Sequence, residues 1–145
     1  MIAVTIGVGD KWREIAECST DSVRERTGLE TRVLGEEAMA KYGFVQPHWL
    51  KFRLFEEFPE AETILYFDAD TIFLQEWDPR VFARRSEFIC VRDRDEYENI
   101  RSESRLIDVP ANMYFNGGFF IANRTHHAAL LHKAEHDLPE FRGAS

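Results

Sequence analysis

Short apolar runs rich in β-branched and aromatic residues recur along the chain, separated by stretches with helical spacing or turn-forming residues. Runs of about four to eight such residues are typical of strands buried on both faces of a sheet. The sequence predicts strands over residues 2–8, 31–34, 64–67, 88–91 and 118–122. Apolar positions spaced three and four residues apart predict helices. These cover residues 11–26, 36–42, 49–58 and 126–136.

Capping and breaking residues mark the ends of these helices. We expect Asp10 to cap the first helix and Thr125 the last, because a short polar side chain accepts hydrogen bonds from free N–H groups. Gly28 and Gly43 should end the helices before them, and Pro59 should end the helix over 49–58. The buried face of the first helix is predicted to carry Ile15, Cys18, Ser19, Ser22 and Val23.

The order of strands and helices predicts an α/β fold, a Rossmann-like and mainly parallel sheet flanked by helices, in a single domain over residues 1–145. Polar residues 93–108 show no clean period and are predicted to form a long loop. Ligands of such sheets bind beyond the carboxyl ends of the strands. Asp10 and the Asp68-Ala69-Asp70 motif both follow strand ends, so we expect them to line one crevice.

Composition narrows the partners. Of 145 residues, 44% are hydrophobic and 30% charged, as in an ordinary globular protein, and the net charge of -8 argues against a nucleic-acid partner. The sequence shows neither an apolar run long enough to span a membrane nor a signal peptide, so we expect a cytoplasmic protein. Cys18 and Cys90 are widely separated and are expected to be free, buried thiols.

The strongest chemical signal is the pair of carboxylates, Asp68 and Asp70, between two apolar runs. Ionised aspartate is costly in such surroundings unless a positive group meets it. Two hard oxygen ligands at a strand end suit Mg²⁺ or Mn²⁺, and such an ion is usually shared with substrate phosphates. The alternative is one solvated turn aspartate and one helix-capping aspartate.

Other candidate residues each have a plainer interpretation. Lys51 either adds positive charge beside a diphosphate or is a surface lysine on an amphipathic helix. Trp12 either stacks on a nucleobase or packs on the first helix. Gly117 and Gly118 either allow close approach of a ligand to the backbone, with the Asn116 amide bonding it, or form a turn into a strand.

Two polar groups complete the candidates. His132 and His136 share a helix face at a spacing that could bind a metal, although solvated helix histidines are far commoner. The cluster of Asp93, Asp95 and Glu96 follows a predicted strand, and it is either a solvated loop or part of an acceptor site.

Four segments resemble, in order, the GT-A nucleotide-sugar glycosyltransferases, most closely family 8, the glycogenin and lipopolysaccharide galactosyltransferase type. Residues 4–12 resemble the first strand and nucleoside loop, and residues 49–54 resemble the basic helix before the metal motif. Residues 66–71 resemble the Asp-x-Asp motif, and residues 114–123 resemble the strand that begins Phe-Asn-Ser/Ala-Gly.

The resemblance implies a GT-A fold and a metal-dependent transfer of sugar from a UDP-sugar, with retention of anomeric configuration. It implies that Mn²⁺ or Mg²⁺ is bound directly by Asp70, while Asp68 either binds the metal directly as well or contacts the ribose. The other implied donor contacts are Thr5, Ile6, Gly7, Asp10, Trp12, Lys51, Ala69, Asn116, Gly117 and Gly118. The acceptor is an unidentified carbohydrate, lipid-linked or protein molecule, a homodimer is possible, and no catalytic residue is assigned.

The chain also departs from the family pattern. Members normally continue to an acidic segment and to a histidine motif that supplies a third metal ligand, and neither is recognisable before Ser145, as in a short or truncated form. A nucleotide-sugar-binding protein without turnover is therefore an alternative function. A second alternative is a haloacid-dehalogenase-type phosphatase with Asp68 as the nucleophile. In those phosphatases the Asp-x-Asp motif normally lies on the first strand, whereas in this chain it lies in mid-chain.

Overall fold

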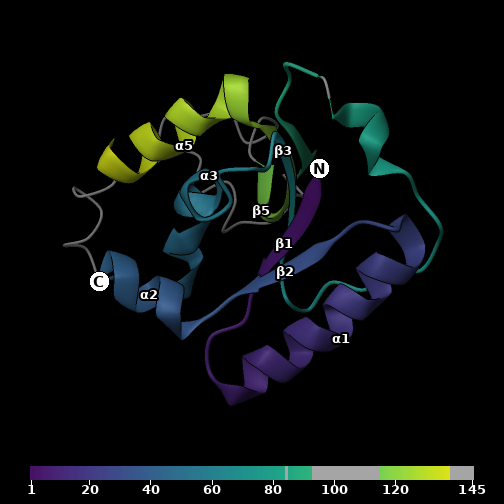
Figure 1. The fold of residues 1–145 in the computed structure, drawn as a ribbon, viewed down its shortest axis with the longest axis horizontal. Coiled ribbons are helices and arrows are strands. Elements are labelled where there is room, and N and C mark those ends of the chain that lie inside the picture. The colour runs from purple at the N-terminus through teal and green to yellow at the C-terminus, as the bar shows by residue number, and fades with distance from the viewer. Residues whose placement is uncertain (84, 93–114, 138–145) are drawn as a thin grey trace.

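The computed structural model describes residues 1–83, 85–92 and 115–137 (Figure 1). The strands are β1 (Ile2–Ile6), β2 (Thr31–Leu34), β3 (Thr63–Phe67), β4 (Ile89–Arg92) and β5 (Phe115–Asn123). The α-helices are α1 (Asp10–Thr27), α2 (Glu36–Tyr42), α3 (Leu54–Glu57) and α5 (Arg124–Asp137). Two 3₁₀ helices, η1 (Pro47–Arg53) and η2 (Pro79–Phe82), complete the elements.

The strands form one mixed sheet in the order β2-β1-β3-β5-β4. β2, β1 and β3 are parallel, whereas β5 is antiparallel to both β3 and β4. Four strands therefore run in one direction, as the mainly parallel prediction requires, and β5 alone is reversed. This reversal brings the beginning of β5 beside the carboxyl end of β3, where Phe67 pairs with Phe119.

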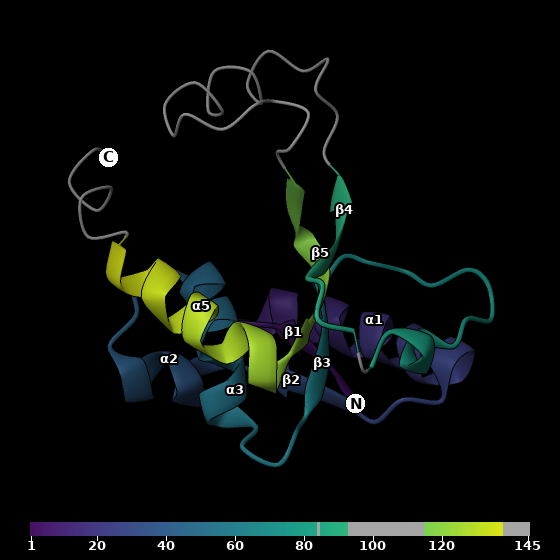
Figure 2. The same cartoon turned by 90° about the horizontal axis from the view of Figure 1, so that it is seen from above.

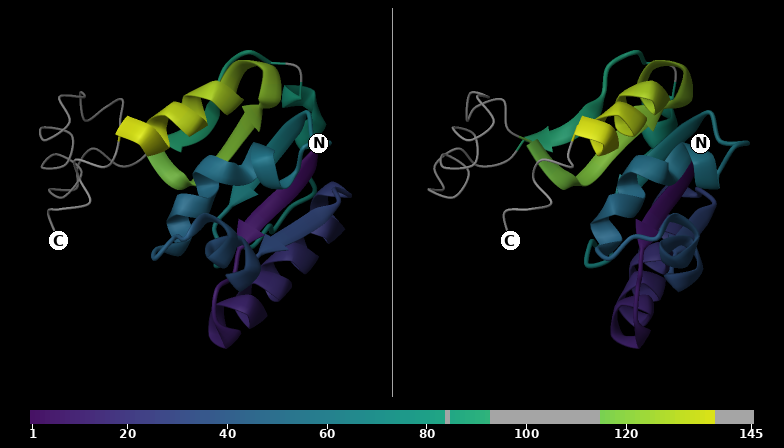
Figure 3. Two further views of the ribbon diagram at one scale, coloured as in Figure 1. Left: turned by 60° about the vertical axis from the view of Figure 1, so that its left-hand side comes forward. Right: turned by 90° about the vertical axis from the view of Figure 1, so that its left-hand side faces the viewer.

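Helices cover both faces of the sheet, so the molecule has three layers (Figure 2). One face packs against α2, η1, α3 and α5, and its core includes Val4, Leu50, Leu54, Ile64 and Tyr66. Figure 3 shows α5 lying along this face beside β5. The opposite face packs against α1 and η2, with Ala3, Val23, Leu65 and Phe67 at its centre. Successive residues of β1 and β3 alternate between these two cores because side chains alternate across a strand.

The buried face of α1 confirms the prediction at Ser19 and Val23 but not at the other predicted residues, since Ile15 and Ser22 are only half-buried. The buried residues share small size or a hydroxyl group, and they are Ala16, Ser19, Thr20, Val23 and Thr27. Cys18, predicted to be buried, is exposed. A β-carbon on Gly7 would lie 2.9 Å from that of Ala16, so α1 sits too close to β1 for large side chains. Close packing of α1 against the sheet therefore favours small residues, and the apolar pattern alone predicts only part of the buried face.

The expected N-terminal caps are also wrong, whereas the glycine stops are confirmed. Gly9 occupies the cap position of α1 without a side-chain cap, and Glu36 accepts its N–H at 2.6 Å. In α5, Asn123 takes the part expected of Thr125, because its Oδ1 accepts the Thr125 N–H at 3.0 Å. Gly28 and Gly43 both adopt the left-handed conformation that ends a helix.

The single helix predicted over 49–58 is instead a 3₁₀ helix followed by one α-helical turn. It begins two residues earlier, where Pro47 provides a fixed φ for the first turn. In 3₁₀ geometry, residues three apart lie almost directly above one another. The change therefore places His48 and Lys51 on the same side of η1.

The structure also bears on the expectations for the two cysteines, for membrane-spanning helices and for the predicted loop over 93–108. Cys90 is half-buried, and burial raises the pKa of its thiol, but Cys18 is not the buried thiol that we expected. Within the described ranges, no helix is both long and apolar enough to cross a membrane. The predicted loop over 93–108, its acidic cluster Asp93, Asp95 and Glu96, and Tyr114 all lie outside the described residues.

Candidate functional site

A cavity of about 310 Å³ opens at the carboxyl ends of β1 and β3. Its lining comes from β1, α1, η1, β3 and the turn after β3. The lining residues are Ile6, Trp12, Pro47, His48, Lys51, Tyr66, Asp68, Ala69 and Asp70. Both carboxylates of the Asp-x-Asp motif thus face one cavity, together with the lysine and the indole that the sequence singled out.

The turn that carries the two carboxylates is anchored on three sides. The Asp68 N–H donates to the Gly118 carbonyl at 2.7 Å, and the Thr71 N–H donates to the Asp68 carbonyl at 3.0 Å. The hydroxyl of Ser19 on α1 donates to the Thr71 carbonyl at 2.5 Å. Ser22 follows one turn later and accepts the Phe73 N–H at 3.2 Å. Because β5 and α1 both hold the turn, the backbone that carries the two carboxylates is anchored at the strand end.

The Asp68 carboxylate receives two donors on the same oxygen. The Tyr66 hydroxyl donates to Oδ1 at 2.7 Å, and the Lys51 ammonium lies 3.1 Å from it. Tyr66 is only 2% exposed. Burial raises the pKa of its phenol, and the negative charges of Asp68 and Asp70 raise it further. The phenol is therefore a permanent donor to Asp68.

Lys51 lies within the site, since its side chain is only 20% exposed. It also donates to the Gly117 carbonyl at 3.0 Å, and its ammonium lies 4.7 Å from the centre of the Tyr66 ring. These contacts favour the charged role for Lys51 over that of a surface lysine. They also connect η1, β3 and β5 at one point.

The glycine pair of β5 approaches this point closely at one of its two positions. A β-carbon on Gly118 would lie 2.7 Å from Asn116 Oδ1, 3.0 Å from Asp68 Cγ and closer still to Asp68 Oδ2. The Gly118 N–H donates to Asn116 Oδ1 at 2.7 Å. On Gly117 an added β-carbon would meet no described atom within 4 Å. Gly118 therefore makes room for the Asp68 carboxylate, whereas Gly117 contributes its carbonyl.

Besides Tyr66 on β3, two aromatic side chains line the cavity from other elements. Trp12 on α1 is 47% exposed, so much of its indole remains free for a ligand. His48 on η1 was missed by sequence reasoning, because a lone histidine carries no motif. Its only signal is the three-residue spacing to Lys51, which has meaning once the segment is 3₁₀. Burial, and then the charge of Lys51, lowers the pKa of His48.

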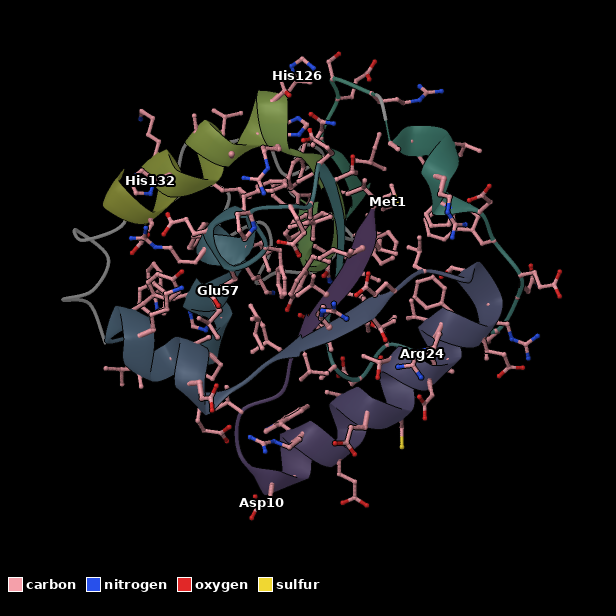
Figure 4. All side chains as sticks on the ribbon, in the orientation of Figure 1. Met1, Asp10, Arg24, Glu57, His126 and His132 are labelled. Carbon is pink, nitrogen blue, oxygen red and sulfur yellow. The ribbon has the colours of Figure 1, made fainter. Side chains whose placement is uncertain are left out.

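Several predicted donor-binding residues do not line the cavity. Thr5 is fully buried in β1, and Gly7 packs against α1. Asp10 lies at the exposed tip of α1 and points to solvent (Figure 4), so the crevice shared with the Asp-x-Asp motif does not include it. Asn116 is not part of the lining, and its Oδ1 accepts the N–H of Gly118.

The donor set fits a hard divalent cation. Asp68 and Asp70 present carboxylate oxygens to one cavity, and Gly118 leaves room for the Asp68 carboxylate itself. Over residues 1–83, 85–92 and 115–137, no three His, Cys, Asp or Glu side chains gather to hold a metal. His132 lies on the outer part of α5 (Figure 4), 3.3 Å from Arg53 and 3.4 Å from Glu56. The side chain of His136 is outside the described part.

The family model for glycosyl transferase family 8 matches residues 23–129. This match covers most of the chain, including the helix before the motif, the Asp-x-Asp turn and β5. The chain belongs to glycosyl transferase family 8. No curated protein matches this family 8 chain by sequence.

Solved structures with the same fold include three glycosyltransferases, each 14% identical in sequence to this family 8 chain. The galactosyltransferase LgtC, solved with donor and acceptor sugar analogs, aligns with a TM-score of 0.64 over 94% of this chain and 66% of its own. GlyE of Streptococcus pneumoniae TIGR4 aligns with a TM-score of 0.59 over 99% of this chain and 39% of its own.

The third is a glycosyltransferase involved in glycosylation of the PBCV-1 major capsid, with a TM-score of 0.57 over 97% of this chain and 68% of its own. These likenesses confirm the predicted GT-A fold. The family 8 chain spans just under two thirds of the length of LgtC.

Proposed function

We propose that this family 8 chain is a metal-dependent glycosyltransferase that takes a sugar from a UDP-sugar. The observation that carries the proposal is the shared cavity in which Asp68, Asp70 and Lys51 lie beside an exposed indole. Such a cavity offers oxygen ligands for a cation, a positive charge for phosphate and a flat surface for a base. Family membership supports sugar transfer over the hydrolysis of phosphate esters.

Each residue has a proposed task in holding the donor. Asp70 and Asp68 would hold Mn²⁺ or Mg²⁺, which, when bound, stabilises negative charge on the departing diphosphate as a Lewis acid. Lys51 reaches the same side of the cavity and contacts a phosphate oxygen. Trp12 stacks on the uracil, and the main chain at Ile6 lies beside the nucleoside.

The donor sugar is expected to lie against the beginning of β5. Asn116 is exposed there, and its amide nitrogen is available to a sugar hydroxyl while its Oδ1 accepts the Gly118 N–H. The small residues Gly117 and Gly118 permit close approach to this backbone. Retention of anomeric configuration and a carbohydrate, lipid-linked or protein acceptor are further parts of the proposal.

Calorimetric titration with UDP, with and without Mn²⁺, tests the binding half of the proposal. We expect UDP to bind with Mn²⁺ present and Asp70→Ala to remove the metal-dependent part, because the variant lacks a carboxylate that faces the cavity. Asp21→Ala removes the same charge from an exposed position on α1 and serves as the matched control. Undiminished binding by Asp70→Ala would sink the assignment.

Turnover is tested separately by the release of UDP from UDP-sugars in the presence of Mn²⁺. Release that depends on Asp70 is expected for a transferase, since water can replace the acceptor. UDP binding without release from any UDP-sugar would instead indicate a nucleotide-sugar-binding protein of the same fold.

A further inference from the structure

The ammonium group of Lys51 pairs with Asp68, one of the two carboxylates proposed to hold the cation. Its Nζ lies 3.1 Å from Asp68 Oδ1 and 3.0 Å from the Gly117 carbonyl. Oδ1 also accepts the Tyr66 hydroxyl, so two protein donors already satisfy this oxygen. The negative charge of Asp68 is therefore compensated from within the chain.

We propose that Lys51 is an internal counter-ion of Asp68 that opposes binding of a divalent cation until a diphosphate draws the lysine away. This inference rests on the proposed function, because the diphosphate is part of the proposed donor. It concerns Lys51 in both states of the site: paired with Asp68 when the cavity is empty, and paired with phosphate when the donor is bound.

Charge explains the opposition. A divalent ion held by Asp68 would lie within a few ångströms of the Lys51 ammonium, and like charges at such separations repel even in high dielectric. Lys51 is largely shielded from water, which weakens screening. Loss of the lysine charge should therefore tighten binding of the cation alone by roughly tenfold.

The geometry of the lysine explains the release. An ammonium group has three donors on a flexible stem, so it can exchange one acceptor for another without a change in backbone. Of its two hydrogen-bond acceptors here, one is a carboxylate and the other a neutral carbonyl. A diphosphate offers more negative charge than Asp68, and a cation then compensates the carboxylate that the lysine leaves.

The test is titration of Mn²⁺ into the protein without nucleotide, with the free ion measured by electron paramagnetic resonance. Lys51→Gln should bind Mn²⁺ roughly tenfold more tightly than the native chain. Lys51→Arg keeps the charge and should match the native chain. Lys41→Gln removes a lysine that pairs with Glu57 away from the cavity and should also leave Mn²⁺ affinity unchanged.

Thermal unfolding of each variant shows that it is folded before titration. Adding Asp68→Asn to Lys51→Gln should abolish the gain, since the released carboxylate is its source. Equal Mn²⁺ affinity of Lys51→Gln and the native chain, or an equal gain in Lys41→Gln, would overturn the inference.

The same variants distinguish this inference from the proposed function. UDP with Mn²⁺ should bind Lys51→Gln more weakly than the native chain, opposite in sign to the effect on Mn²⁺ alone. Undiminished UDP binding by Lys51→Gln would overturn the idea that Lys51 leaves Asp68 to pair with phosphate when the donor binds. Failure of the native chain to bind UDP would overturn the proposed function, while the comparison of Mn²⁺ affinities would still stand.

Discussion

Replacement of Gly118 by alanine should damage the site through a single added methyl group. That carbon would lie 3.0 Å from Asp68 Cγ and 2.7 Å from Asn116 Oδ1, distances at which one of the partners must move. The backbone of Gly118 is held by the bond from its carbonyl to the Asp68 N–H. The Asp68 carboxylate is half-exposed and has room to turn outward, so it is the group that we expect to shift.

The magnitude follows from what the shift costs. Turning a side chain about 30° from its rotamer costs about 0.5–1.5 kcal/mol, and overpacking costs about 1–3 kcal/mol. The partly exposed pair with Lys51 adds up to about 1 kcal/mol at most. We therefore expect Gly118→Ala to weaken metal-dependent UDP binding by about 1–3 kcal/mol, or roughly 5–150-fold. The loss of folding stability should be smaller, because the carboxylate can turn toward water.

The neighbouring glycine offers a matched control. Alanine at Gly117 adds the same methyl group where no described atom lies within 4 Å, and the carbonyl that accepts from Lys51 remains. Isothermal titration of UDP and Mn²⁺ into both variants, with thermal unfolding of each, gives the comparison. If the two variants bind UDP within twofold of each other, the steric reasoning about Asp68 is wrong.

Three further predictions concern stability. Above about pH 10, the free energy of unfolding of the native chain should fall by about 1.4 kcal/mol more per pH unit than that of Tyr66→Phe, because burial raises the pKa of the Tyr66 phenol and only the unfolded chain releases its proton. Urea unfolding of both proteins as a function of pH measures this difference, and parallel curves would contradict it. Leu50→Ala should lower the free energy of unfolding by about 2–5 kcal/mol because Leu50 is fully buried, whereas Val45→Ala, at an exposed position, should lower it by at most about 0.5 kcal/mol. Chemical denaturation measures both values, and similar losses would refute the difference in packing. Arg124→Ala should lower the free energy of unfolding by about 2–4 kcal/mol, since the Arg124 guanidinium donates to three backbone carbonyls. Arg124→Lys should keep only part of that stability, and full native stability in the same denaturation assay would show that the positive charge alone is enough.

Local patterns were enough to predict most elements and the centre of the site. The apolar runs predicted the strands best at β1 and β3, which are buried between two helical layers along their whole length. The Asp68–Asp70 pair marked the end of β3 because carboxylates are out of place in such a run. Lys51 was singled out by the resemblance of residues 49–54 to the family's basic helix, and the structure shows it against Asp68.

The errors arise where distant segments decide the outcome. The face of α1 depends on how closely Gly7 lets the helix approach, which is not visible in the spacing of apolar residues. The 3₁₀ form of η1 depends on packing against α5 and the sheet, and with it the position of His48. Thr5 and Asp10 do not line the cavity, because the Thr5 side chain lies inside the core and Asp10 lies at the tip of α1, and their donor contacts stay predictions.

The placement of β5 has a consequence for how the chain matures. This strand comes after β4 in sequence but lies between β3 and β4, so β4 has no neighbour in the described sheet until β5 arrives. During synthesis, a nascent chain that has not yet reached residue 115 exposes the open side of β3, a template for aggregation. The same strand supplies the Gly118 carbonyl that fixes Asp68. Affinity for UDP should therefore report completed folding, and chains that end before residue 115 should both aggregate and fail to bind UDP.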